Sequence, residues 1–114
     1  MDRGGTGEKD AVAYFRARGF DILECNWRYS YYEIDLLVSR DRILHIIEVK
    51  SRGSDRFGMP ESAVTPLKLS NLMKAAAHYM AKHPQWKKVQ FDVLAIRLRY
   101  KRPPEFFLIE DVYL

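Results

Sequence analysis

The sequence predicts an α/β domain whose elements follow the order α-β-β-β-α-β-β, and three observations predict this class. Two neighbouring segments are almost continuously apolar, as is usual for strands covered on both faces. A long apolar stripe at helical spacing follows them in the chain. Apolar residues make up 47% of the 114, a globular composition rather than a disordered one. At this length we expect residues 1–114 to form a single domain.

The first half of the chain predicts one helix followed by three strands. Residues 6–19 are expected to be helical, because Val12 and Phe15 carry an apolar stripe, with Thr6 as a cap and Gly19 as a stop. The strands are expected over residues 20–27, 31–38 and 43–50, the last two joined by the polar tetrapeptide 39–42.

The second half predicts a polar loop, a helix and two further strands. The loop covers residues 51–64. In the helix, which extends to residue 82, Thr65 is a suitable N-cap and Pro66 suits the first helical position. Its apolar stripe consists of Leu69, Leu72, Met73, Ala76 and Met80 and is read as core. Residues 89–98 and 106–109 complete the set of strands.

Charged residues interrupt the two central apolar strands. Asp35, Glu48 and Lys50 lie in segments that read EIDLLV and ILHIIEVK, where a charge is costly unless it is paired or coordinated. If the hairpin closes symmetrically about residues 40–43, Asp35 lies opposite Glu48. Because side chains alternate along strands, Lys50 then joins them on one face. The opposite face would hold Ile34, Leu36, Val38, Ile43, Ile47 and Val49.

Two ionised carboxylates held this close repel each other. One can stay protonated, the lysine can compensate, or a divalent cation can lie between them. Oxygen ligands favour Mg²⁺ or Mn²⁺ over zinc, and a lysine beside such a cation suits hydrolysis of a phosphodiester. The alternative is a buried carboxylate–lysine pair that only sets the strand register.

The chain resembles the PD-(D/E)xK nuclease superfamily, which has the restriction-endonuclease-like fold and includes Holliday-junction resolvases. More closely, it resembles the YraN-like family of uncharacterised bacterial endonuclease-like proteins. The resemblance covers residues 7–96 and rests on Gly7-Glu8, Gly19-Phe20, Asn26-Trp27-Arg28, Glu33-Ile34-Asp35-Leu36, Glu48-Val49-Lys50-Ser51-Arg52, Gly58, Ala63-Val64-Thr65-Pro66 with Lys68, and Phe91-Asp92-Val93. In one departure, Tyr32 stands where the family usually has glycine before the Glu-Ile-Asp run.

The resemblance implies a central mixed sheet flanked by helices and a metal-dependent site. Asp35, Glu48 and the Val49 carbonyl would bind Mg²⁺ or Mn²⁺, while Lys50 would position the attacking water or stabilise the transition state. Glu8 would approach from the first helix, and Lys68 would be an auxiliary polar residue. A plainer role remains open for Glu8, which also suits a helix N-terminus electrostatically.

The excess positive charge lies in the second half of the chain. Residues 1–57 hold ten basic and ten acidic residues, whereas residues 58–114 hold nine and five. We therefore expect a nucleic-acid partner, DNA in the first instance. The candidate substrate-binding residues are Arg28, Arg52, Lys87, Lys88, Arg99 and Lys101. A solvated surface without a partner, a non-catalytic nucleic-acid-binding module and a homodimer are the alternatives.

The remaining composition predicts a cytoplasmic location. Cys25 is the only cysteine, so the chain forms no internal disulfide. No segment approaches the length of a membrane span, and residues 1–10 lack the apolar segment of a signal peptide.

Overall fold

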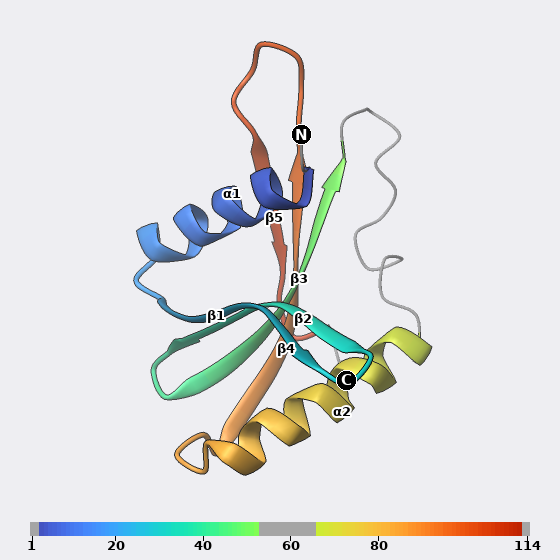
Figure 1. Cartoon of the computed structure of the whole chain (residues 1–114). Helices are drawn as coiled ribbons and strands as arrows, with labels where there is room; N and C mark the ends of the chain where they lie inside the picture. Colours follow the sequence, from blue (N-terminus) through green and yellow to red (C-terminus); the bar gives the residue numbers. More distant parts are fainter. Residues whose placement is uncertain (1–2, 53–65, 113–114) are drawn as a thin grey trace.

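A computed structural model describes residues 3–52 and 66–112. The predicted order of elements is confirmed (Figure 1). The elements are α1 (Arg3–Ala17), β1 (Asp21–Tyr29), β2 (Tyr32–Arg40), β3 (Ile43–Arg52), α2 (Pro66–Lys82), β4 (Lys88–Arg97) and β5 (Glu105–Ile109). Pro66 is the first residue of α2, as predicted, whereas the proposed cap Thr65 lies outside the described residues.

The five strands form one mixed sheet in the order β1-β2-β3-β4-β5. β3 and β4 are parallel, and the other neighbouring pairs are antiparallel. The long crossover that parallel strands require runs from the end of β3 through α2 to β4. The predicted α/β fold of the restriction-endonuclease-like class is therefore confirmed.

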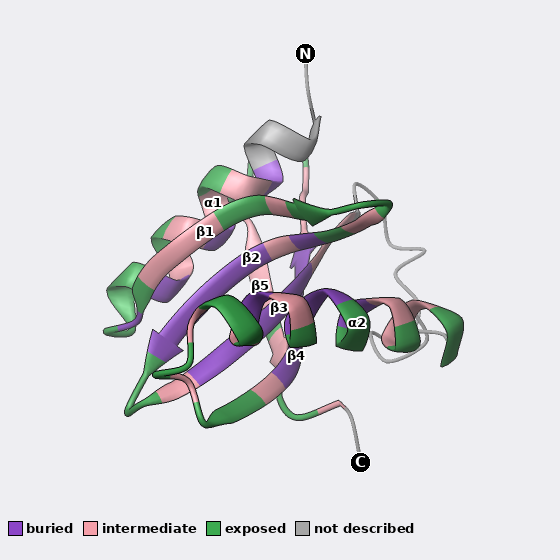
Figure 2. Cartoon of the chain, turned by 60° about the horizontal axis from the view of Figure 1, so that its bottom comes forward, coloured by how far each residue is buried: buried purple, intermediate pink, exposed green. Residues whose placement is uncertain are grey.

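The two helices cover opposite faces of the sheet, and Figure 2 shows the buried central strands between them. Beneath α2, a core cluster includes Leu37, Leu44 and Ile46 of the sheet. Beneath α1, a second cluster holds Leu36, Val38 and Ile47, with Val49 packed against it, as predicted. Ile34, which was expected to lie with this second set, packs with the α2 cluster instead.

A two-residue turn closes the central hairpin. Asp41 and Arg42 both have positive φ, 53° and 66°, the backbone of the tight turn that matches the twist of a hairpin. Arg40 pairs with Ile43 across it, and the ladder continues to Leu36 opposite Ile47. The predicted register is thus confirmed as far as Leu36 and Ile47, where the backbone pairing ends just before Asp35 and Glu48.

Glycines shape both ends of α1. Gly19 has a φ of +83° and ends the helix with the paired hydrogen bonds of a Schellman motif, from Gly19 N to Arg16 O and from Phe20 N to Phe15 O. The predicted stop is confirmed, but the predicted cap is wrong, because Thr6 lies inside a helix that begins at Arg3. A Cβ on Gly7 would lie 3.6 Å from that of Ser51, so this part of α1 packs closely on β3.

A buried histidine–aspartate pair lies on the α1 face, away from the candidate site. His45 Nδ1 is 2.8 Å from Asp92 Oδ2, and both residues are at most 5% exposed. The other oxygen of Asp92 accepts hydrogen bonds from Gln90 and from the backbone N–H of Asp111. His45 is thus a core residue, and it is paired with Asp92.

Among residues 3–52 and 66–112, no helix combines the length and the apolar character needed to cross a membrane.

Candidate functional site

The site lies where β2 and β3 separate. Backbone pairing between these strands ends at Leu36 and Ile47. Beyond that point the N–H of Val49 donates to the carboxylate of Asp35, with Val49 N and Asp35 Oδ2 2.8 Å apart. A side chain therefore replaces the backbone partner at this position. Because a residue in a strand directs its N–H and its C=O to the same side, the Val49 carbonyl also faces towards β2.

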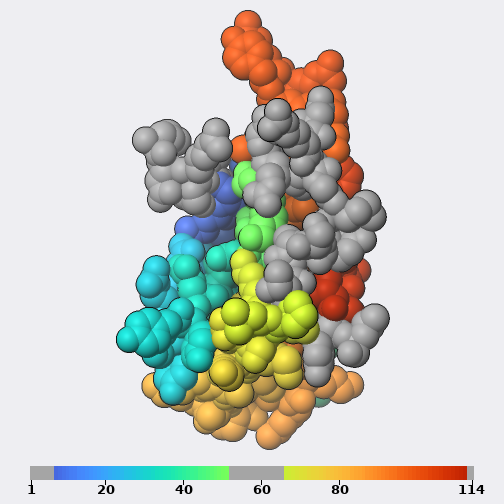
Figure 3. Space-filling model, turned by 90° about the vertical axis from the view of Figure 1, so that its right-hand side faces the viewer, coloured from blue at the N-terminus to red at the C-terminus, as the bar shows by residue number. Residues whose placement is uncertain are grey.

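Glu48 is the most buried charged residue of the site, at 5% exposure. Its Oε2 contacts Lys68 Nζ and lies 3.3 Å from Lys50 Nζ. Lys68 is the third residue of α2, which begins beside the end of β3, and Figure 3 looks onto this side of the molecule. Asp35, Glu48, Lys50 and Lys68, four of the predicted residues, therefore come together.

The electrostatics of the site are strongly perturbed. The pKa of Asp35 is raised from 3.8 to about 6, chiefly by burial and next by the charge of Glu48, against the hydrogen bond from Val49. Burial also lowers the pKa of Lys50, and the neighbouring Lys68 adds to this effect. For Lys68, burial opposes the charged form, yet the contact with Glu48 outweighs it and raises the pKa.

The atoms of the site that could bind a metal ion are all oxygens. Asp35 and Glu48 supply carboxylates, and the Val49 carbonyl completes the predicted set. Within the part of the chain that the structure describes, no three His, Cys, Asp or Glu side chains gather as a metal-binding group. A cation at this point would thus rely on two carboxylates, a carbonyl and water, which is the chemistry of Mg²⁺ or Mn²⁺.

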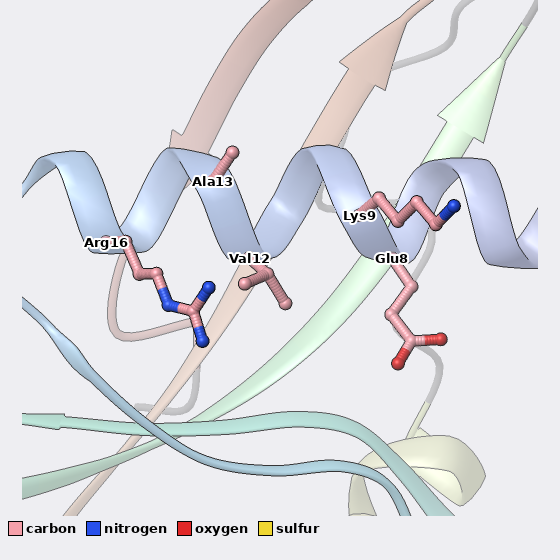
Figure 4. A pocket seen from close by; sticks show the side chains of 5 residues that line it. All are labelled: Glu8, Lys9, Val12, Ala13 and Arg16. Atoms are coloured by element: carbon pink, nitrogen blue, oxygen red, sulfur yellow. The ribbon is translucent and has the colours of Figure 1, made fainter.

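The structure does not bring Glu8 into this cluster. Glu8 Oε1 accepts a hydrogen bond of 2.6 Å from Asn26 of β1, and Cys25 also lies close to it. With Arg16, Glu8 lines a cavity of about 380 Å³ along α1 (Figure 4). Burial and the proximity of Glu8 raise the pKa of the Cys25 thiol, which makes it less reactive.

The predicted substrate-binding residues separate into two groups. Lys87 and Lys88 are exposed at the start of β4. In the parallel register Lys88 lies beside Ile43, and Val93 lies beside Glu48. Lys88 precedes Val93 by five positions, which is about 17 Å along the strand. These two lysines therefore lie at the end of the sheet opposite to the site.

The other basic residues lie at the same end of the sheet as the site. Arg52 ends β3 beside Arg97, although its side chain is outside the described part. Arg99 Nε is 3.9 Å from Glu105, and Lys101 is exposed beyond β4. Arg28, on the β1–β2 hairpin, is 3.7 Å from Glu33 and mostly exposed. Arg99 and Lys101, however, lie six and eight positions beyond Val93, the residue beside Glu48, so along β4 they are no nearer to the site than Lys88 is.

One further residue near the site escaped the sequence analysis. Asn71 follows Lys68 by three positions in α2, so the two side chains share a helix face. Both line a cavity of about 140 Å³ beside the β1–β2 hairpin. The spacing from Lys68 was the available signal, but it identifies Asn71 only once Lys68 is known to face the site.

The fold and the site define a class of protein, an α/β domain of the restriction-endonuclease-like fold with two carboxylates and two lysines where its central strands diverge. Within that class, the chain belongs to the uncharacterised protein family UPF0102, whose sequence profile matches residues 7–96. The predicted YraN-like family is confirmed.

Relatives from distant bacteria carry the same family name. The chain is 39% identical over 110 residues to a UPF0102 protein of Mycolicibacterium vanbaalenii, covering 96% of this chain and 91% of the relative. It is 45% identical over 91 residues to a UPF0102 protein of Syntrophomonas wolfei, covering 79% of each. A UPF0102 protein of Flavobacterium psychrophilum is 37% identical over 114 residues, covering 98% and 93%. These names assign no activity.

Proposed function

We propose that this protein is a metal-dependent endonuclease that hydrolyses phosphodiester bonds in DNA, including branched or damaged DNA. One observation carries the proposal. Asp35 and Glu48 are held together with Lys50 and Lys68 at the separated ends of β2 and β3. The pKa of Asp35, raised by its burial and then by Glu48, supports a role beyond structure, because perturbed groups of this kind cluster at functional sites.

The residues present fit a hard divalent cation. Asp35, Glu48 and the Val49 carbonyl would hold Mg²⁺ or Mn²⁺, since these cations prefer oxygen ligands. When bound, such a cation polarises a phosphoryl oxygen and lowers the pKa of a coordinated water.

The two lysines supply the positive charge that attracts an anionic substrate. With Asp35 ionised, the four charged side chains sum to zero, so a bound divalent cation would leave the site with two positive charges. That excess favours an anionic phosphodiester. Lys50, on the same strand face as Glu48, is placed to stabilise the charge that develops on the phosphate. Lys68 holds the Glu48 carboxylate in position.

Cleavage of a panel of branched, flapped and single-stranded DNA with Mg²⁺ or Mn²⁺ tests this proposal. Asp35→Asn and Glu48→Gln should each lower the rate by at least about a thousandfold, on the scale of lost metal catalysis. Asp41→Asn makes the same chemical change at an exposed turn far from the site and should leave the rate unchanged. Cleavage that survives Asp35→Asn would refute the assignment.

A second function is favoured by the pairing of Glu48. Its carboxylate is already neutralised by two ammonium groups without any cation, as in a nucleic-acid-binding module that has no catalysis. Such a module binds DNA in a salt-sensitive way, and its affinity is indifferent to EDTA and to Asp35→Asn. Titration of Mn²⁺ into the wild type and into Asp35→Asn by calorimetry separates the two functions. A nuclease requires that the wild type binds Mn²⁺ and that Asp35→Asn does not, whereas the non-catalytic module has no such requirement.

A further inference from the structure

The cavity of about 140 Å³ lies beside the proposed catalytic site. It lies between the β1–β2 hairpin and the first turns of α2 and is lined by Tyr31, Tyr32, Glu33, Lys68, Asn71 and Leu72. Lys68 belongs to both places, because its Nζ contacts Glu48. Glu33 precedes Asp35 by two residues, about 7 Å along β2. Lys68 therefore connects the cavity to Glu48.

The lining of the cavity combines flat apolar surfaces with hydrogen-bonding groups. Two tyrosine rings and the buried Leu72 supply the apolar surface. Asn71 both donates and accepts hydrogen bonds, and the Glu33 carboxylate accepts them. A nucleobase has this same combination of flat faces and a polar edge. The charges of Glu33 and Lys68 offset each other in the lining, so the cavity offers a phosphate no net positive charge, and its flat apolar surfaces favour a base over the backbone.

Tyr31 differs from the other aromatic residues of this hairpin. The Trp27 ring packs edge-on against Tyr79, and Tyr29 stacks on His78 with ring centroids 3.6 Å apart. Tyr31 instead is 98% exposed at the turn. Its ring is thus available to a planar ligand at the mouth of the cavity, where base–aromatic stacking gives appreciable affinity.

We propose that this cavity binds one unpaired nucleobase of the nucleic acid whose phosphate lies at Asp35 and Glu48. Tyr31 stacks on the base, and Asn71 and Glu33 contact its edge. The proposal rests on the proposed function and deepens it, because a base inside a duplex cannot reach such a cavity unless it leaves the stack. It identifies the substrate class as nucleic acid with an unpaired nucleotide at the cleavage point.

Binding without catalysis provides the first test. Single-stranded DNA that contains 2-aminopurine is titrated in EDTA, and stacking is followed by the quenching of its fluorescence. Tyr31→Ala should weaken binding by about fivefold to a hundredfold, the range expected for one stacked base, and Asn71→Ala should weaken it as well. Two matched controls, Tyr100→Ala at another exposed tyrosine and Ser70→Ala on the exposed side of α2, should bind as the wild type does.

Cleavage then separates this inference from the proposed function. A duplex with one unpaired nucleotide should be cut at that point in Mn²⁺, and the fully paired duplex should be cut far more slowly. Equal cleavage of both, with Tyr31→Ala no worse than Tyr100→Ala, would overturn the base cavity and leave the nuclease intact. Tyrosine-dependent binding without cleavage of any substrate would support the cavity and overturn the nuclease.

Discussion

Replacing Asp35 with asparagine should make the metal-free protein more stable at pH 8. Asparagine removes the charge but keeps an oxygen that can accept the hydrogen bond from Val49 N. The carboxylate of Asp35 is partly buried and lies near Glu48, and both effects raise its pKa, burial the more strongly. The ionised form is therefore disfavoured in the folded state relative to the unfolded chain.

The size of the effect follows from the shift in pKa. A rise from 3.8 to about 6 corresponds to about 3 kcal/mol, at about 1.4 kcal/mol for each unit. For a group whose pKa is raised on folding, the stability contributed by the protonated form is fully present below pH 3.8 and is lost as the pH rises through about 6. The advantage of the variant should thus be largest above pH 7, fall to roughly half by pH 5 and vanish near pH 3.

Urea denaturation in EDTA at several pH values measures this difference in the free energy of unfolding. Asp41→Asn is the control, because Asp41 is largely exposed, and its effect should stay near zero throughout. If Asp35 only stabilises the hairpin as a structural ion pair, the variant is less stable than the wild type at pH 8. That result, or a difference that does not change with pH, would refute the reasoning.

Three further predictions concern the site, the buried pair and the basic surface. Mn²⁺ should bind about tenfold more weakly at pH 5 than at pH 8, because protonated Asp35 cannot act as a ligand; calorimetry measures both affinities. His45→Ala should lower the free energy of unfolding by about 3 kcal/mol in urea denaturation, because it removes a hydrogen-bonding partner of the buried Asp92 carboxyl. Arg28→Ala, on the hairpin beside Glu33, should weaken DNA binding and lower its salt slope by about one, and Lys88→Ala should do neither, as fluorescence titrations over a range of salt would show.

The central hairpin shows how much of the site the sequence could predict. Alternation of side chains placed Glu48 and Lys50 on one face, and symmetric closure about residues 40–43 placed Asp35 opposite Glu48. The weak point was the turn, because Asp41 and Arg42 are not the residues that usually adopt positive φ at both positions. The apolar pattern on the two faces outweighed this weak preference and set the register.

Contacts between distant elements could not be predicted in the same way. Glu8 was expected near the start of a helix, but α1 begins at Arg3 and Glu8 lies beyond its first turn, where Asn26 on the neighbouring strand holds its side chain by a hydrogen bond. Lys87 and Arg99 belong to one basic stretch in the sequence, yet β4 separates them by its full length. In both cases the position depends on how elements pack in three dimensions, which the local pattern does not encode.

The separation of β2 from β3 links the fold to the proposed chemistry. An uninterrupted ladder would satisfy Val49 with a backbone partner and leave no room for ligands between the strands. Here Asp35 takes that hydrogen bond and remains partly buried beside Glu48, which raises the free energy of its ionised form. A hairpin that needed only stability would be better served by a neutral side chain at this position. The two lysines offset this cost only in part, since the pKa of Asp35 stays raised in their presence. The charged arrangement is thus understandable as a site prepared for a cation that would remove the remaining repulsion.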